Sequence, residues 1–424
     1  MARFAAGVLA AAVLSAGAWA EGTWYKGVTH VHSLWSDGDA APEVIAQWYK
    51  ERGYHFMCFS DHFLLQEGEK WYPVGGKSKL QAEHIEGIRT QFGADWVQVR
   101  EAEGVETAGQ EMRLKTHEEL SAKFNEAGKF LLVPAEEITT RGGSPHVNGL
   151  NLREAIESAS RDDVSKLLQQ YIDAVHEQRT RLGIPMLAHV NHLNWSDGVT
   201  AEEMIAVRGL EFFEVFNGHS GVHSWGIPEK GMPSGDRHWD IIQSIKQMTE
   251  PGYVLYGVST DDSHEYHEWG LGKTNPGRGW IMVRSETLEG GALMNAMLQG
   301  DFYASTGVVL KDVQRSKEKL RIEIQAEDGV EYTTQFVGTL RGFDSASEPV
   351  KDHQGVLLPR ATRKYSDEIG KVLLETKDKS PEYVFTGEEL YVRARVVSTK
   401  PVENPHEEGD FGMAWVQPVV VGAG

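Results

Sequence analysis

The sequence is poor in the residues that several common chemistries need. Its 424 residues include one cysteine, Cys58, so no intramolecular disulfide can form. Cys58 lies in the apolar run HFMCFS, which indicates a small buried side chain without a catalytic role. The sequence also lacks the G-x-S-x-G motif of serine hydrolases. A disulfide-stabilised fold and a serine or cysteine nucleophile are therefore not expected.

Basic residues are also scarce. Lysine and arginine number 42, against 62 aspartate and glutamate residues, and the formal net charge is -20 at pH 7. A field of this sign repels nucleic acid and anionic lipid. We therefore expect no nucleic-acid or membrane partner, and a small molecule as the substrate.

Long apolar stretches are missing beyond the first twenty residues, so no later segment is expected to span a bilayer. The first twenty residues have the pattern of an export signal. Arg3 supplies a positive charge, residues 4–14 are apolar and rich in alanine, and Ala18-Trp19-Ala20 is a small-x-small cleavage site. We expect cleavage after Ala20 and a periplasmic or secreted protein.

Strand and helix patterns alternate from Gly27 to about Val283. Predicted strands include KGVTHVH, HFMCFS, FLLVPAEEI, PHVNGLNL, IPMLAHV, LEFFEVFN and YVLYGVST, and predicted helices include residues 41–52, 162–181 and 240–248. This alternation indicates an α/β fold with a parallel sheet, open or closed into a barrel. After about Gly307, alternating β-branched residues predict a small antiparallel β domain. The predicted divisions are an export signal over 1–20, an α/β domain over 21–305 and a β-rich domain over 306–424.

Histidines and acids follow nearly all of these predicted strands. They are His30, His32, Asp37, His62, Glu137, His146, His189, Asp262 and His264. The i, i+2 spacing of His30 and His32 places both rings on one face of a strand, and Asp262 and His264 repeat it. Side chains at neighbouring strand ends of a barrel converge on one pocket. Imidazoles and carboxylates together indicate a zinc, manganese or iron site.

The order of these motifs resembles the polymerase and histidinol phosphatase (PHP) superfamily. The matching motifs are HxHSxxSDG, SDH, an acid in PxxEIT, HVNGL, AHxN, ExFN and SxDxSH, in that order over residues 24–310. The signal-like N-terminus, the segment FYASTGVVL and the closing AWVQP resemble the exported CehA/McbA-type metallohydrolases of that superfamily.

The resemblance implies a distorted (β/α)7 barrel with two or three divalent metal ions (zinc, manganese or iron) at the carboxyl ends of its strands. One metal would be held by His30, His32, Glu137 and Asp262, a second by Glu137, His146 and His189, and a third by Asp37, His62 and His264. Glu137 fits the bridging glutamate better than Glu136, and Asp61 is expected to support the ligands from behind.

The resemblance also implies hydrolysis by a metal-activated hydroxide at Glu137, with His192 or His264 as the group that protonates the leaving group. Most characterised members are phosphoesterases, so a phosphate ester is the expected substrate. Candidate substrate-binding residues are Arg141, Glu214, Asn217, Lys273 and Arg278. We expect His219, His223, His238 and His267 at the surface or behind the ligands.

Two alternatives stay open at this point. The same hydroxide could attack a carbamate, ester or amide carbonyl, as the CehA/McbA name implies. A non-catalytic periplasmic protein that binds metal or ligand is the other. The sequence also leaves a homo-oligomer open.

Overall fold

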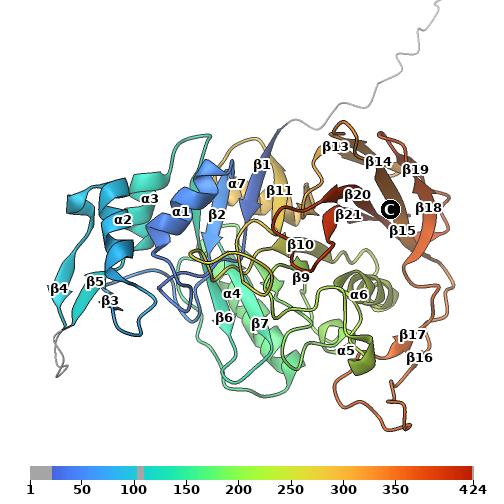
Figure 1. Ribbon diagram of the computed structural model, residues 1–424. Helices are drawn as coiled ribbons and strands as arrows, with labels where there is room; N and C mark the ends of the chain where they lie inside the picture. The colour runs from blue at the N-terminus through green and yellow to red at the C-terminus, as the bar shows by residue number, and fades with distance from the viewer. Residues whose placement is uncertain (1–21, 103–108, 423–424) are drawn as a thin grey trace, which may run out of the picture.

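One large, curled sheet organises the molecule (Figure 1). The computed structural model describes residues 22–102 and 109–422, so the predicted export signal over 1–20 lies outside the described residues. The sheet has thirteen strands in the order β10-β9-β8-β7-β6-β2-β1-β11-β12-β21-β20-β15-β18. The mixed α/β class predicted from the sequence is confirmed.

The first nine strands of the chain that enter this sheet come from the predicted α/β region. They are β1 (Thr23–Val28), β2 (Phe56–Phe59), β6 (Leu131–Thr139), β7 (His146–Leu150), β8 (Leu187–Val190), β9 (Phe212–Asn217), β10 (Tyr256–Thr260), β11 (Trp280–Ser285) and β12 (Phe302–Ser305). The pairs β1–β2, β2–β6, β8–β9 and β9–β10 are parallel. Strand β7 is antiparallel to both neighbours, and β11 is antiparallel to β1 and β12.

The predicted (β/α)7 barrel is not confirmed. The sheet curls until β10 lies beside β11 and β12, but no ladder of backbone hydrogen bonds joins them within the described ranges. Side chains span this seam instead. The amide of Gln417 accepts from Gly257 N at 3.0 Å and donates to Gly257 O at 2.8 Å, and Ser259 Oγ donates to Ser305 O at 3.1 Å.

Helices lie around the sheets (Figure 1). They are α1 (Pro42–Glu51), α2 (Ala82–Phe92), α3 (His117–Phe124), α4 (Val164–Leu182), α5 (Ala201–Ile205), α6 (Gly235–Thr249) and α7 (Gly290–Leu298), with short 3-10 turns η1 (Ala94–Trp96) and η2 (Pro228–Lys230). Helix α4 begins after Asp163, whose side chain accepts from Lys166 N, and ends at Gly183 in the left-handed conformation. Helix α6 begins five residues before the predicted 240–248, because Ser234 caps it by accepting from Arg237 N. None of the described helices has the length and apolar character needed to span a bilayer.

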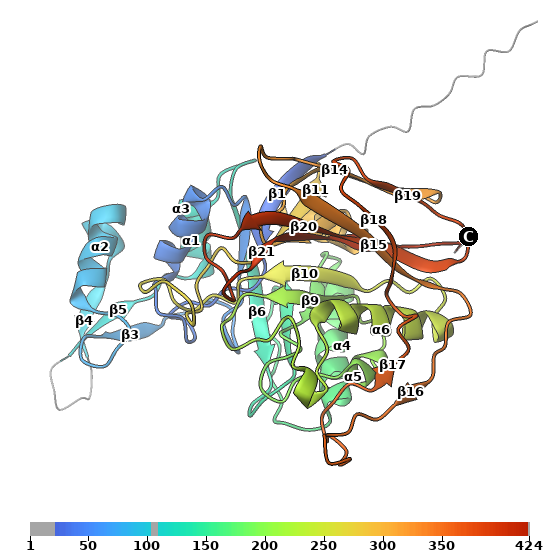
Figure 2. The same cartoon turned by 45° about the vertical axis from the view of Figure 1, so that its right-hand side comes forward.

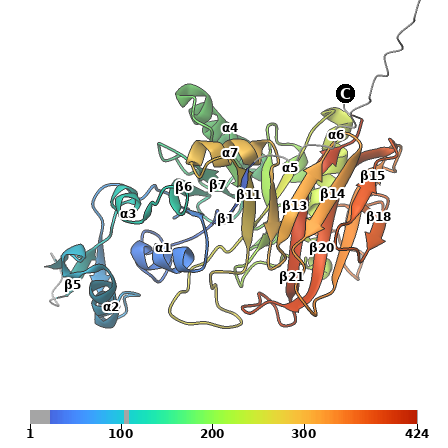
Figure 3. The same cartoon turned by 90° about the horizontal axis from the view of Figure 1, so that it is seen from above.

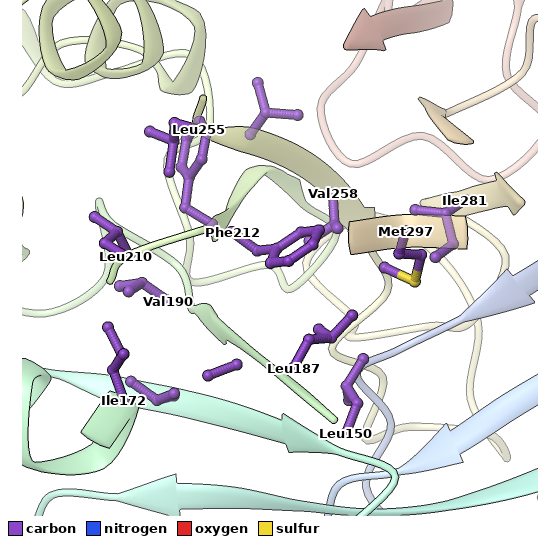
Figure 4. Close-up of a cluster of buried hydrophobic side chains, with 14 of the residues drawn as sticks. Leu150, Ile172, Leu187, Val190, Leu210, Phe212, Leu255, Val258, Ile281 and Met297 are labelled. Carbon is purple, nitrogen blue, oxygen red and sulfur yellow. The ribbon is translucent and has the colours of Figure 1, made fainter. Parts of the chain in front are cut away.

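The main core fills the inside of the curl (Figure 4). Leu187, Phe212 and Val258 come from three adjacent strands and lie on the side of Met297 of α7, while Ile172 of α4 lies beside Val190. Each side chain is almost fully buried, and burying one of this size stabilises the fold by about 1.5–3 kcal/mol. The core therefore holds strands β8, β9 and β10 in register, and the candidate site lies at their ends.

The C-terminal strands continue the same sheet rather than forming a separate one. They are β15 (Tyr332–Leu340), β18 (Lys371–Thr376), β20 (Glu389–Pro401) and β21 (Phe411–Val420). Strand β12 ends at the predicted boundary, 305/306, and pairs with β21. Figure 3 shows these strands side by side beyond β11. Strand pairing therefore crosses the predicted domain boundary.

Smaller sheets flank the large one. Strands β13 (Leu310–Arg315), β14 (Lys319–Ile324) and β19 (Glu382–Val384) form one, and β16 (Ser347–Glu348) pairs with β17 (Lys364–Tyr365). A third, made of β3 (Trp71–Val74), β5 (Gln110–Arg113) and β4 (Val99–Glu101), lies with α2 at the opposite end of the molecule from the C-terminal strands (Figure 2).

Candidate metal centre

Most of the predicted ligands lie together at the end of the sheet where its parallel strands have their carboxyl ends. His30 and His32 follow β1, His62 follows β2, Glu137 lies in β6, and Asp262 and His264 follow β10. Strand β7 runs in the opposite direction, so its first residue, His146, pairs with Thr139 at the end of β6. Strand direction therefore explains how a residue that begins a strand joins residues that follow strands.

Ligand atoms of His30, His32, Glu137 and Asp262 lie close together around the two histidine rings. His30 Nε2 and His32 Nε2 are 3.1 Å apart, and each lies 3.2 Å from Asp262 Oδ1. Glu137 Oε2 lies 3.4 Å from His30 Nε2 and 3.3 Å from His32 Nε2. The His30, His32 and Glu137 atoms form a triangle with edges of 3.1, 3.3 and 3.4 Å, and a point about 2 Å from all three corners lies near its centre. Bonds from a metal to imidazole nitrogen or carboxylate oxygen are about 2.0–2.2 Å long. These residues therefore fit a divalent metal ion.

The two oxygens of Glu137 face different groups of histidines. Glu137 Oε2 also lies 2.9 Å from His62 Nδ1, while Oε1 lies 3.1 Å from His146 Nδ1 and 3.2 Å from His192 Nε2. Ligand atoms of His62, Glu137 and His146 lie close enough together for a second ion. Glu136 points elsewhere and accepts from Ile156 N at 2.8 Å. Glu137 is thus the carboxylate placed to connect two metal positions.

A third group lies at the mouth of the site. Asp37 Oδ1 is 3.2 Å from His264 Nε2 and Asp37 Oδ2 is 3.6 Å from His62 Nε2. His32 joins the same group, with its Nδ1 3.6 Å from Asp37 Oδ1. The three residues predicted for a third metal therefore lie together, and the Asp37 side chain is 54% exposed.

His189 is placed differently from the prediction. It was expected with Glu137 and His146, but it is not among the three groups of candidate ligands, and its ring centre lies 6.3 Å from that of His30. The ring is fully buried, and neither nitrogen has a hydrogen-bond partner among the described residues. Burial lowers its pKa to about 4. A neutral, buried imidazole without partners is costly unless something binds it, which fits an ion-binding role.

The charges of the site balance one another. Burial by itself disfavours the charged form of His30, but Asp262, Glu137 and Glu214 outweigh it and hold the pKa of His30 well above its usual value. Burial likewise opposes ionisation of Glu137, yet the surrounding imidazoles hold its pKa well below the usual range. Metal ions bound here would take the place of the protons on these rings.

Glu214 and Asn217, predicted as substrate-binding residues, contact the candidate ligands. Glu214 Oε1 accepts from His30 Nδ1 at 2.7 Å, which leaves His30 Nε2 free to bind a metal. Asn217 donates to Glu214 Oε2 at 2.8 Å and to Asp262 Oδ2 at 3.0 Å. Asp61 also lies behind the ligands, where it accepts from Ser33 N at 2.8 Å. Glu214 and Asn217 therefore position ligands, and their contact with a substrate stays a prediction.

The groups of ligands open into a pocket of about 340 Å³. Arg141, predicted to contact a phosphate, lines it together with His192 and His264. Lys273 and Arg278 do not line it. Lys273 pairs with Glu265 and Glu268, and the Arg278 guanidinium donates to Gly218 O at 2.9 Å, so both hold loops.

Several residues that line the pocket were given no role in it by the sequence, among them Phe63, Trp195 and His219. His219 was expected at the surface or behind the ligands. Its Nδ1 accepts from Gly221 N at 2.9 Å, so the proton of the neutral ring is on Nε2. Burial lowers the pKa of His219 to about 4, so the ring is a neutral donor at pH 7. No motif in the sequence signals this role.

No family model matches this sequence, and no curated protein sequence matches it. Among solved structures, the chain is similar to a two-domain protein from Bacteroides vulgatus ATCC 8482 that contains a predicted PHP-like metal-dependent phosphoesterase. The identity is 13%, the TM-score is 0.37, and the match covers 94% of this chain and 95% of that one. A likeness this weak carries no argument about fold or function.

Proposed function

We propose that this protein is an exported, metal-dependent hydrolase of the PHP type, and that it acts on a small phosphate ester. The group of His30, His32 and Glu137, with Asp262 Oδ1 3.2 Å from both histidines, carries the proposal, because the spacing of its three members fits metal–ligand bonds. The signal-like pattern of residues 1–20 supports export. The ordered motifs support the PHP type and, through the closing AWVQP, the CehA/McbA branch.

The donor atoms suit zinc, manganese or iron, and two or three ions would be held around Glu137 and at Asp37. When bound, such ions supply Lewis acidity, which lowers the pKa of water from 15.7 toward about 7 and offsets negative charge on a substrate. Glu137 keeps the ligand groups within reach of one another. Glu214 fixes the orientation and the tautomer of His30.

Other residues of the pocket are placed to contact a substrate. The neutral His219 presents its Nε2 proton to the pocket and can donate it to a substrate oxygen. His192 Nε2 lies 3.2 Å from Glu137 Oε1, so it is placed to hold or pass a proton beside that carboxylate. His264, the other predicted proton donor, faces Asp37, which makes a ligand role the better fit.

Arg141 favours a phosphate ester over a carbonyl substrate. It lines the pocket, and a guanidinium matches the paired oxygens of a phosphoryl group. A carbamate or ester carbonyl offers one acceptor oxygen and no negative charge. Arg141→Met should therefore raise KM for phosphate esters and leave KM for a carbamate unchanged.

The direct test compares hydrolysis of bis(p-nitrophenyl) phosphate, p-nitrophenyl phosphate and 1-naphthyl methylcarbamate by protein loaded with manganese or zinc. Asp262→Ala removes the carboxylate that lies beside His30 and His32, and the exposed Asp173 provides the matched control, Asp173→Ala. We expect phosphate ester turnover that chelation abolishes, that Asp262→Ala lowers at least about 100-fold, or about 2.7 kcal/mol, and that Asp173→Ala leaves unchanged. Carbamate turnover alone would replace the phosphoesterase with a carbonyl hydrolase. Metal binding without turnover of any of the three would contradict both.

A further inference from the structure

A second pocket, of about 560 Å³, shares no lining residue with the candidate metal centre. Its walls come from β1, α1, the loop around Trp269 and the end of β20. Nothing in the proposed hydrolysis uses it. Its lining is unusual in an acidic protein, because three tryptophans and several cationic side chains meet there.

Three cations line this pocket, Lys26, Arg52 and Lys400, together with two carboxylates, Glu327 and Glu403. Lys26 Nζ lies 3.9 Å from the ring centre of Tyr54 and 4.1 Å from that of Trp280. Its ammonium makes no ion pair within the described part of the chain. The Arg52 guanidinium lies over the Trp48 ring at 4.2 Å and likewise has no carboxylate partner among the described residues. Aromatic faces stabilise a cation only in part, so both retain capacity for an anion.

The unpaired polar atoms buried in the walls are donors as well. Trp48 Nε1 and the Tyr54 hydroxyl are both buried without a hydrogen-bond partner among the described residues. Tyr54 is 3% exposed. Both atoms have almost no exposed surface, so a ligand in the open pocket would not contact them. Lys26 and Arg52, which have no ion pair among the described residues, are the groups of the pocket that favour an acceptor with negative charge.

The shape of the pocket adds a second requirement. Trp48 and Trp269 are stacked with ring centres 5.7 Å apart, and Trp269 is 48% exposed at the pocket edge. An exposed tryptophan face next to apolar walls favours a flat ring in the ligand. We propose that this pocket binds a small organic anion that carries a flat ring, with the anionic group at Lys26 and the ring against Trp269.

The electrostatics of Lys26 support this orientation. Burial lowers the pKa of the Lys26 ammonium to about 8, although Asp261 acts in the opposite direction. The ammonium is therefore still charged at pH 7 while poorly compensated, and an anion beside it would stabilise the charge. Lys400 at the rim does not serve in this way, because it pairs with Glu327.

The test is calorimetric titration of the metal-loaded full chain with 2-naphthoate, with the neutral 2-naphthalenemethanol for comparison. We expect one naphthoate per chain, bound about tenfold or more tightly than the alcohol. Lys26→Met should weaken naphthoate binding about tenfold or more and leave the alcohol unaffected. Lys129→Met provides the matched control, because Lys129 is 72% exposed and lies outside the pocket.

Two further variants test whether naphthoate binds in this pocket and not at the candidate metal centre. Trp269→Ala changes an exposed side chain and so tests the pocket even where Lys26→Met fails to fold; it should weaken naphthoate binding about fivefold. Asp262→Ala disables the candidate metal centre and should leave naphthoate binding intact. Equal binding of acid and alcohol, unchanged binding by Trp269→Ala, or loss of binding in Asp262→Ala would each overturn the proposal.

Discussion

Glu214→Gln tests whether the residues behind the ligands control metal binding. Four buried donors converge on the Glu214 carboxylate. His30 Nδ1 and Thr260 Oγ1 each lie 2.7 Å from Oε1, while His192 N at 2.6 Å and Asn217 Nδ2 at 2.8 Å reach Oε2. Glutamine has the same shape but only one acceptor oxygen. Its amide nitrogen must face either His192 N and Asn217 Nδ2, which can only donate, or His30 Nδ1 and Thr260 Oγ1, whose hydroxyl can turn to accept.

The magnitude follows from this count. One or two buried donors are left without an acceptor, at about 1–3 kcal/mol each, so the metal-free variant should lose about 1–6 kcal/mol of unfolding free energy. If the glutamine oxygen faces His30, the imidazole stays oriented but loses its charged partner. Loss of such a partner lowers metal affinity about 10–100-fold. We therefore expect zinc or manganese to bind at least about tenfold more weakly.

The assay is competition for zinc against a fluorescent chelator, with denaturant unfolding of the metal-free protein measured in parallel. Glu211→Gln is the matched control, because Glu211 directly precedes β9 at the end away from the metal centre. Glu211 accepts from Arg179 Nη1 at 3.2 Å and is partly exposed. Glu211→Gln should therefore lower the unfolding free energy by at most about 1 kcal/mol and leave metal affinity unchanged. Equal metal affinity in Glu214→Gln and the wild type would refute the positioning role.

Two further predictions concern α6, one for its contact with Arg393 of β20 and one for His238 within it. Arg393→Met should lower the unfolding free energy by about 3–5 kcal/mol in denaturant titration, because the buried carboxylates of Asp240 and Asp236 lose the guanidinium that lies 2.7 Å and 2.8 Å from them. Arg89→Met removes a surface ion pair and should cost at most about 1 kcal/mol. A comparable loss of stability in both variants would contradict the prediction. Burial lowers the pKa of His238 to about 4, so the unfolded chain binds a proton at this residue first as the pH falls. Stability should drop by up to about 3 kcal/mol between pH 6.5 and 4, and unfolding of His238→Gln over the same range should show a shallower drop; an identical pH profile would exclude this residue as the cause.

The candidate ligands could be predicted because local patterns determine their placement. An i, i+2 pair after a strand puts both side chains on one face whatever the rest of the fold does, as the 3.1 Å contact between His30 and His32 shows. Asp262 and His264 also lie at this end of the strands, but Asp262 has a φ of 48°, so their placement does not follow from extended backbone alone. The ends of helices α1 and α4 were also predicted within about two residues, since Pro42 and Gly183 act on the chain locally.

Two features of the sheet could not be predicted in this way, namely the direction of β7 and the seam between β10 and strands β11 and β12. The antiparallel direction of β7 depends on how a short loop turns, and nothing periodic in HVNGL distinguishes a parallel from an antiparallel strand. The edge of β10 is satisfied by Gln417, a residue 160 positions from Gly257 along the chain. Such a long-range side-chain contact leaves no local signature, so the closed barrel was a natural but unconfirmed prediction.

Glu214 and His219 show why the type of residue does not fix its role. In the sequence each is a polar residue in or just after the predicted strand LEFFEVFN. Yet Glu214 faces His30 from behind, where it can act only through the ligand, while His219 presents a defined Nε2 proton to the open pocket. The difference lies in which neighbour satisfies each side chain. A carboxylate occupied by four donors has no acceptor left for a substrate, whereas a ring with one nitrogen held by Gly221 N has its other nitrogen available. Hydrogen-bond occupancy, rather than proximity to the pocket, therefore separates residues that touch a substrate from residues that position the ligands.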